Sequence, residues 1–313
     1  MKRHWLRFAA VFCAAAMISA PVWAAPKNQQ GKEEGDAAQA APAVELYTGG
    51  APAAEALGWR IGCQAYSFNK FTFFEAVDKT ASMGLHYIEA YGGQPLNAEH
   101  PEVQMGHDMP KEYYPVVLDK LKQAGVQLVA YGVVGLGTDE AANRKVFDFA
   151  KAMGIETITS EPPLDAMELV DKLANEYEIN VAFHNHPKPS KFYDYKAVLK
   201  ACEGRSKRLG SCADTGHWMR SDINPLDAIK ALEGRIISLH IKDLNKYGKG
   251  DEHDVPWGSG QADIRAILTE LHRQGFKGVF SAEYEHNWLN SVPEISQGVK
   301  FVNEVAQELS AKK

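Results

Sequence analysis

Cysteine is scarce in this chain of 313 residues, and its four cysteines show none of the close spacings that build disulfide frameworks or thiolate zinc sites. Cys13 lies in an N-terminal apolar run, which leaves Cys63, Cys202 and Cys212, an odd number, for the rest of the chain. A small domain held together by disulfides is therefore excluded. We expect these three side chains to be buried apolar residues, and a Cys202 to Cys212 bridge after export stays open as the alternative.

The chain also lacks an excess of positive charge. Its formal net charge is −6, and removal of an N-terminal segment that carries Lys2, Arg3 and Arg7 would bring it to −9. Because an acidic surface does not attract a phosphate backbone, the composition argues against a nucleic-acid partner. No glycine-rich loop follows the first two predicted strands, which argues against an open sheet that binds dinucleotides.

A long apolar run is absent as well. The N-terminal run over residues 8–18 is well short of the roughly 20 residues that span a bilayer. Basic residues precede it, and Val22, Trp23 and Ala24 follow it in a pattern that suits cleavage of a secretory signal. We predict a signal peptide over residues 1–24, export to the periplasm or beyond, and no membrane insertion once the signal is removed.

The segment 25–57 lacks any apolar period and is rich in Ala, Gly, Pro, Gln and Glu. Such a segment buries too little surface to offset its ordering entropy, so we predict a flexible leader. The remaining residues, 58–313, have about the 250-residue length of a one-domain α/β barrel.

Within residues 58–313, short β-rich runs alternate with longer helical patterns. The predicted strands are 61–68, 87–91, 127–133, 157–161, 180–186, 208–214, 236–241 and 279–284. The predicted helices are 73–83, 111–124, 139–153, 165–177, 193–203, 225–233, 262–274 and 293–310. Strict alternation implies a parallel sheet, and eight such units in one domain imply a closed (β/α)8 TIM barrel.

Ionisable side chains stand at the carboxyl ends of most of these strands, where barrel enzymes place their chemistry. Four of them come from four different strand ends and form an oxygen-rich set with one imidazole, which suits Mn²⁺, Mg²⁺ or Co²⁺. We predict that one divalent metal ion, with Mn²⁺ preferred and Zn²⁺ also compatible, is bound by Glu161, Asp214, His240 and Glu283.

Other polar residues on the same rim are candidates for catalysis and for substrate binding. Glu161, Glu283, His186 and Lys242 are the predicted catalytic residues. His184 and His186 share one face of their strand because side chains alternate with period two, so one of them is a candidate fifth ligand or proton carrier. The predicted substrate-binding residues are Glu89, His184, His217 and Trp257.

Two of these candidates have a structural alternative. Trp257 lies in the irregular stretch 246–260, which we expect to lie over the barrel mouth, and it either stacks on a sugar or packs against the last helix. Lys242 either holds substrate oxygens or pairs with Asp243 or Glu285.

Four motifs in this chain resemble the xylose isomerase-like TIM barrel superfamily, which includes sugar phosphate isomerases and epimerases and the family 2 type of AP endonuclease. The motifs are Asp214-Thr215-Gly216-His217, His240-Ile241-Lys242-Asp243, Val255-Pro256-Trp257-Gly258-Ser259-Gly260 and Ala282-Glu283-Tyr284. The resemblance implies a metal held by two glutamates, an aspartate and a histidine. In many relatives the first glutamate lies on the fifth strand, whereas here that strand carries His184 and His186.

The resemblance implies a metal-dependent isomerase or epimerase that removes a proton next to a carbonyl on a sugar or keto-sugar. The predicted export favours an unphosphorylated substrate. A lyase or hydrolase of 3-keto-glycosides and a non-catalytic carbohydrate-binding barrel are the alternatives. The acidic balance argues against phosphodiester cleavage of the endonuclease IV kind. The expected partner is a small sugar, and a homo-oligomer is compatible with the sequence.

Overall fold

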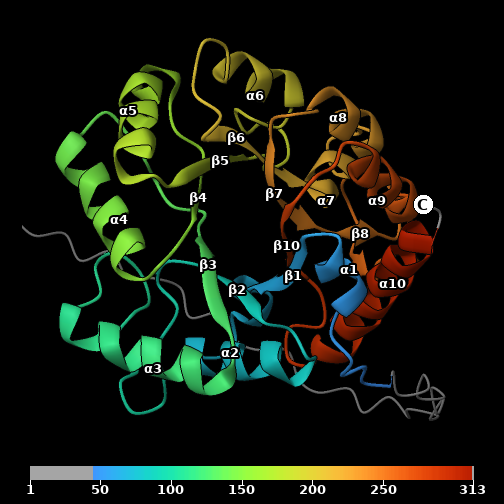
Figure 1. The fold of residues 1–313 in the computed structure, drawn as a ribbon, viewed down its shortest axis with the longest axis horizontal. Coiled ribbons are helices and arrows are strands. Elements are labelled where there is room, and N and C mark those ends of the chain that lie inside the picture. Colours follow the sequence, from blue (N-terminus) through green and yellow to red (C-terminus); the bar gives the residue numbers. More distant parts are fainter. Residues whose placement is uncertain (1–44, 312–313) are drawn as a thin grey trace, which may run out of the picture. The chain divides into compact units, whose positions relative to one another are not determined.

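The computed structural model describes residues 45–311, whose eight main strands form a closed parallel barrel surrounded by helices (Figure 1). Around the barrel each strand pairs with the next in the chain, and the last pairs with the first. The strands are β1 Trp59–Gln64, β2 Tyr87–Ala90, β3 Gln127–Tyr131, β4 Thr157–Ser160, β5 Asn180–His184, β6 Leu209–Asp214, β7 Ile236–Ile241 and β10 Gly278–Ala282. The predicted (β/α)8 barrel is confirmed.

The helices that cover the barrel follow the predicted ranges closely. They are α2 Phe73–Ser82, α3 Tyr114–Ala124, α4 Glu140–Ala152, α5 Met167–Tyr177, α6 Tyr195–Ala201, α8 Pro225–Ala231, α9 Ile264–Arg273 and α10 Val292–Ala311. Polar side chains start several of them. Thr72, for example, begins α2 with a capping box in which Glu75 is the reciprocal partner. At the other end of α3, Gly125 adopts φ 67°, a left-handed conformation that is strained for residues with a Cβ atom.

The structure differs from the prediction at the start of the barrel domain. Residues 45–57, predicted as part of a flexible leader, include the short helix α1 Pro52–Ala56. Ala51 and Ala54 are buried, and the Ala53 amide donates a 2.8 Å hydrogen bond to Asn303 on α10. These contacts with the last helix extend the domain towards the N-terminus. The predicted signal peptide lies outside the described residues.

A second difference concerns the first strand, which ends at Gln64 and not at residue 68. Ala65–Phe68 forms a 3-10 helix because the Gln64 side chain accepts a hydrogen bond from the Tyr66 amide and turns the chain. Also unpredicted is the five-residue helix α7 Thr215–Met219, which starts directly at the end of β6. Both departures occur at strand ends, where side-chain hydrogen bonds redirect the backbone.

The three cysteines of the described region, Cys63, Cys202 and Cys212, are all buried and free. Their role as buried apolar residues is confirmed, and the alternative of a Cys202 to Cys212 bridge is not realised. No helix within residues 45–311 combines the length and the apolar character needed to cross a membrane.

A two-stranded ribbon made of β8 Asp243–Leu244 and β9 Asp254–Val255 follows β7 and anchors the loop between residues 245 and 260. The Asp243 carboxylate accepts hydrogen bonds from the amides of Gly258, Gly260 and Ala262, each 2.9 Å long. Burial raises the pKa of Asp243, although these bonds favour its charged form. The buried Asp243 carboxylate therefore fixes the backbone at the end of this loop.

We expect Asp243→Ala to lower the free energy of unfolding by about 3 kcal/mol, because three backbone amides, of which that of Ala262 is buried, lose a charged acceptor. Urea unfolding of the purified protein measures this loss. Asp243→Asn keeps one acceptor oxygen and serves as the matched variant, for which we expect a smaller loss. Equal stability of the wild type and Asp243→Ala would contradict the anchoring role.

Candidate active site

Most of the predicted chemistry lies at the carboxyl ends of the strands, on one rim of the barrel. In the strand register Asp214 of β6 is opposite His240 of β7, and His240 is opposite Ser281 of β10, two residues before Glu283. His184 ends the neighbouring strand β5. The barrel register therefore brings these residues together although they lie far apart in the sequence.

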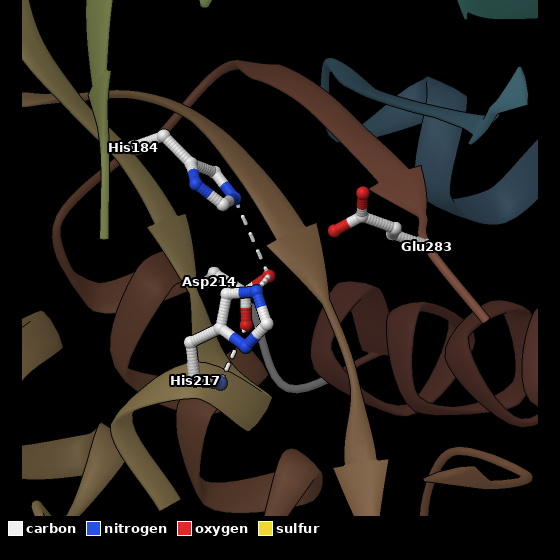
Figure 2. A group of neighbouring side chains, drawn as sticks. All are labelled: His184, Asp214, His217 and Glu283. Carbon is white, nitrogen blue, oxygen red and sulfur yellow. Dashed lines mark hydrogen bonds and ion pairs between the residues drawn. The ribbon is translucent and has the colours of Figure 1, made fainter. Parts of the chain in front are cut away.

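His184, Asp214, His217 and Glu283 form a compact group of buried donors whose ligand atoms all lie within 4.8 Å of one another. Figure 2 shows the rings of His184 and His217 beside Asp214, with the carboxylate of Glu283 turned towards them. Two of the four, Asp214 and Glu283, were predicted as metal ligands, and the other two were predicted as substrate-binding residues. The group has the size and the donor types of a cation site.

Asp214 is held in a defined orientation by the helix that follows it. Its Oδ1 accepts a 2.6 Å hydrogen bond from the His217 amide and so caps α7. Its Oδ2 lies 2.9 Å from Lys242 Nζ and 3.5 Å from the Nε2 atom of His184, which is buried and has no hydrogen-bond partner. Because buried polar atoms are normally satisfied, the Nε2 atom of His184 points to a bound group beside Asp214.

The ammonium group of Lys242 is the positive charge that contacts the carboxylates of this group. It is fully buried, and its Nζ lies 2.9 Å from Asp214 Oδ2, 2.7 Å from Glu283 Oε2 and 3.1 Å from Glu285 Oε2. Burial alone would lower the pKa of Lys242, but these carboxylates outweigh it and raise the pKa well above its usual value. Lys242 is therefore a permanent cation, and of its two predicted pairings the one with Glu285 is present.

His240 lies next to this group but is already engaged at both ring nitrogens. Nε2 is 2.9 Å from Glu89 and Nδ1 is 3.2 Å from Glu283. Glu89 is fully buried and also accepts hydrogen bonds from Thr159 and Ser281. Burial would raise the pKa of Glu89, but the charge of His240 and these hydrogen bonds outweigh it and lower the pKa. Glu89 thus orients His240 from below the rim. It was predicted to bind substrate, but its carboxylate is occupied by these contacts.

Glu161 belongs to a second donor group, with His184 and His186. Its Oε1 is in hydrogen-bond contact with His186 Nδ1 and lies 3.6 Å from His184 Nδ1. Its Oε2 accepts a 2.7 Å hydrogen bond from Ser190. Glu161 therefore lies apart from the Asp214 group, with which it was predicted to share a metal, and the two groups share His184.

More carboxylates than permanent cations meet on this rim. The carboxylates are Asp214, Asp254, Glu283 and Glu285, and the cations are Lys242 and Arg220. Burial would lower the pKa of His184, but the carboxylates of Asp214 and Glu161 outweigh it and raise the pKa to about 9. A mixed imidazole and carboxylate set that includes an unpartnered His184 Nε2 atom fits a divalent transition-metal ion.

A cavity of about 330 Å³ opens above these residues, a size at the lower end of small-molecule pockets. It is lined by Tyr66, Tyr91, Gly92, Val133, His186, His217, Glu283 and Glu285. Tyr66 packs edge to face against both Tyr91 and Trp288, with ring centroids 5.2 and 5.8 Å apart. This aromatic wall gives the mouth an apolar side opposite the ionisable side chains.

Trp257 was predicted either to stack on a sugar or to pack against the last helix, and in the structure it packs against the last helix. Its side chain is buried, its Nε1 donates a 3.2 Å hydrogen bond to the Ile241 carbonyl, and its ring lies against Gly298 of α10. It is therefore a core residue beneath the loop. The loop itself reaches back across the rim, where Lys249 donates a 2.6 Å hydrogen bond to the Lys188 carbonyl.

Sequence reasoning missed the network around Arg220, whose guanidinium contacts Glu285, Asp254 and Glu252 at 2.6, 3.3 and 3.5 Å. Glu285 stands two residues after Glu283, a period-two spacing that could have placed it on the same face. Arg220 lies beyond the last strand residue of its unit, in a turn that no periodicity marks.

The comparisons with known proteins agree with the fold. The family model described as "Xylose isomerase-like TIM barrel" matches residues 77–305. A solved structure of an uncharacterised protein from Parabacteroides distasonis is 33% identical, with coverage of 79% of this chain and 99% of its own and a TM-score of 0.65. No curated protein matches this chain.

Two more distant structures share the fold. A D-tagatose 3-epimerase-like protein is 16% identical, with coverage of 81% of this chain and 99% of its own and a TM-score of 0.60. An IOLI protein with a binding zinc atom is 16% identical, with coverage of 81% and 97% and a TM-score of 0.55. At these identities the similarity shows the fold alone.

Proposed function

Since this chain belongs to the xylose isomerase-like TIM barrel family, we propose that it is a divalent-metal-dependent enzyme that isomerises or epimerises a sugar. It would act on an unphosphorylated sugar or keto-sugar by removing a proton from the carbon next to a carbonyl. The observation that carries the proposal is the buried group of His184, Asp214, His217 and Glu283, in which the Nε2 atom of His184 has no hydrogen-bond partner.

Asp214 and Glu283, together with His184 and His217, would hold the cation, and His240 would orient Glu283. A bound divalent ion would polarise a substrate carbonyl and a neighbouring hydroxyl, which lowers the barrier to proton removal. Mn²⁺, Co²⁺ and Zn²⁺ suit this donor set. The zinc atom named for the IOLI structure supports a metal in this fold.

Glu283 is the carboxylate best placed to move the proton, because it lines the cavity and is also part of the buried group. Lys242 Nζ, 2.7 Å from its Oε2, stabilises negative charge on that side of the cavity. His217 lines the cavity as well, and its Nε2 lies 3.4 Å from Lys242 Nζ. Together these side chains can hold a substrate oxygen while a proton moves at the adjacent carbon.

The charge around the cavity favours a substrate without phosphate. Glu283 and Glu285 line the cavity, and the two neighbouring cations, Lys242 and Arg220, are already paired with carboxylates. A phosphate would therefore meet negative side chains and no free cation in this group. Export of the protein, which we also propose, agrees with an unphosphorylated substrate.

We expect the phosphate ester of any sugar that reacts to bind at least about tenfold more weakly than the sugar itself, because like charges that face each other cost several kcal/mol. Competition between the two compounds in a proton-exchange assay measures this ratio. Tighter binding of the phosphate ester would contradict the proposed substrate class.

The reaction itself is tested by incubating metal-loaded protein with a panel of keto-sugars in D₂O and following deuterium incorporation by NMR. We expect exchange at the carbon next to the carbonyl, accompanied by an isomer or epimer of the substrate. The same protein after chelation is the control, and we expect exchange to stop. Metal binding without exchange on any sugar would favour a carbohydrate-binding barrel.

The open aromatic wall favours one second candidate, elimination from a 3-keto-glycoside. Tyr66 is 38% exposed and Trp288 packs against it at the edge of the cavity, which provides an apolar surface for a second ring or an aglycone. Proton abstraction is the shared first step, and expulsion of the substituent then replaces return of the proton. Release of the aglycone in the NMR assay distinguishes the two reactions.

A further inference from the structure

We propose that Glu161, His184 and His186 form a second divalent-cation site, which shares His184 with the Asp214 group and does not rest on the reaction proposed above. The three residues come from the ends of β4 and β5, and one ligand atom from each lies within 4.8 Å of the others. Two imidazoles and one carboxylate with an open position are a ligand set of catalytic zinc sites.

The shared residue, His184, faces the two groups with opposite edges of its ring. Its Nε2 lies 3.5 Å from Asp214 Oδ2, and its Nδ1 lies 3.6 Å from Glu161 Oε1 and 3.3 Å from His186 Nδ1. The side chain is fully buried, so neither nitrogen is exposed to bulk water. To bind an ion in both groups at once, His184 would have to release both of its N–H protons and bridge the two sites as an imidazolate.

The spacing of the donor atoms suits a small cation. Ligands at roughly 2.1 Å from a tetrahedral zinc ion stand about 3.4 Å apart, close to the two distances that His184 Nδ1 makes in this group. His186 Nδ1 and Glu161 Oε1 are in direct contact and must separate to admit the ion. The His186 side chain is 47% exposed, so a rotation at the mouth can open that pair.

Neighbouring hydrogen bonds orient Glu161 and the two histidines, as hydrogen bonds to metal ligands commonly do. Ser190 donates to Glu161 Oε2 and leaves Oε1 free to face the two imidazoles. Asn185, between the two histidines, exchanges 2.8 Å hydrogen bonds with the backbone of Asp214 and so ties β5 to β6. His186 lines the cavity, so an ion bound there would face the substrate space.

The test is the metal stoichiometry of the full chain after it has been stripped, equilibrated with Zn²⁺ and freed of excess ion. We expect two equivalents in the wild type and one in each of Glu161→Gln and His186→Gln. Ser190→Ala should keep both equivalents and bind the second about tenfold more weakly. The control His253→Ala/His286→Ala removes a stacked histidine pair outside the group and should keep two.

Asp214→Asn separates this proposal from the proposed function. If it loses one equivalent while Glu161→Gln and His186→Gln lose none, the Asp214 group alone binds metal and the second site is wrong. If Glu161→Gln and His186→Gln lose an equivalent that Asp214→Asn keeps, the second site is supported whatever the first group does. Thermal unfolding of each variant shows that it is folded.

Discussion

Replacing Glu283 with Gln is expected to lower the rate of proton exchange into a reactive keto-sugar by about 10²- to 10⁴-fold, the contribution typical of a positioned acid or base. Glutamine keeps the shape of the side chain but can neither accept the proton nor balance the charge of Lys242, 2.7 Å away. Single-turnover exchange in D₂O measures the effect on the chemical step.

Glu304→Gln, an exposed position on α10, is the matched control and should exchange at the wild-type rate. The metal content of both variants is measured in parallel, because Glu283 is also a proposed ligand. If Glu283→Gln exchanges within a few-fold of the wild type while its metal content is unchanged, the proton is moved by another residue, and the proposed role of Glu283 is wrong.

Lys242→Met is expected to lower the free energy of unfolding by about 3–5 kcal/mol, because it leaves buried carboxylates without their counter-charge. Lys242 and Asp214 are both fully buried, so solvent screens their 2.9 Å contact very little. Urea unfolding in metal-free buffer measures the loss. The surface variant Lys120→Met, whose partner Asp78 is largely exposed, should lose no more than about 1 kcal/mol.

Divalent cations should restore part of the stability of Lys242→Met, because two carboxylates that faced the ammonium become free to bind the ion. An ion at about 100 times its dissociation constant would contribute about 2.7 kcal/mol, provided that it binds the folded chain alone. We expect this gain to be larger in Lys242→Met than in the wild type. No gain in either protein would place the cation site away from Asp214 and Glu283.

The sequence by itself was sufficient for the barrel and for the rim on which the chemistry lies. Eight alternating units leave few other topologies, and parallel strands bring their carboxyl ends to one side, so residues such as Asp214 and Glu283 could be placed together from their strand positions alone. Local patterns of this kind depend on neighbours in the chain, which is why the strand and helix ranges agree closely with the structure.

Only the tertiary structure decided which donors face one another. Glu161 and His240 were predicted to share a metal with Asp214, but Glu161 lies with His186. His240 is opposite Asp214 in the register, yet its ring nitrogens contact Glu89 and Glu283. Strand periodicity states which face a side chain occupies but not its distance from side chains on other strands. Those distances depend on strand stagger, on rotamers and on buried hydrogen bonds, all of which exist only once the barrel has closed.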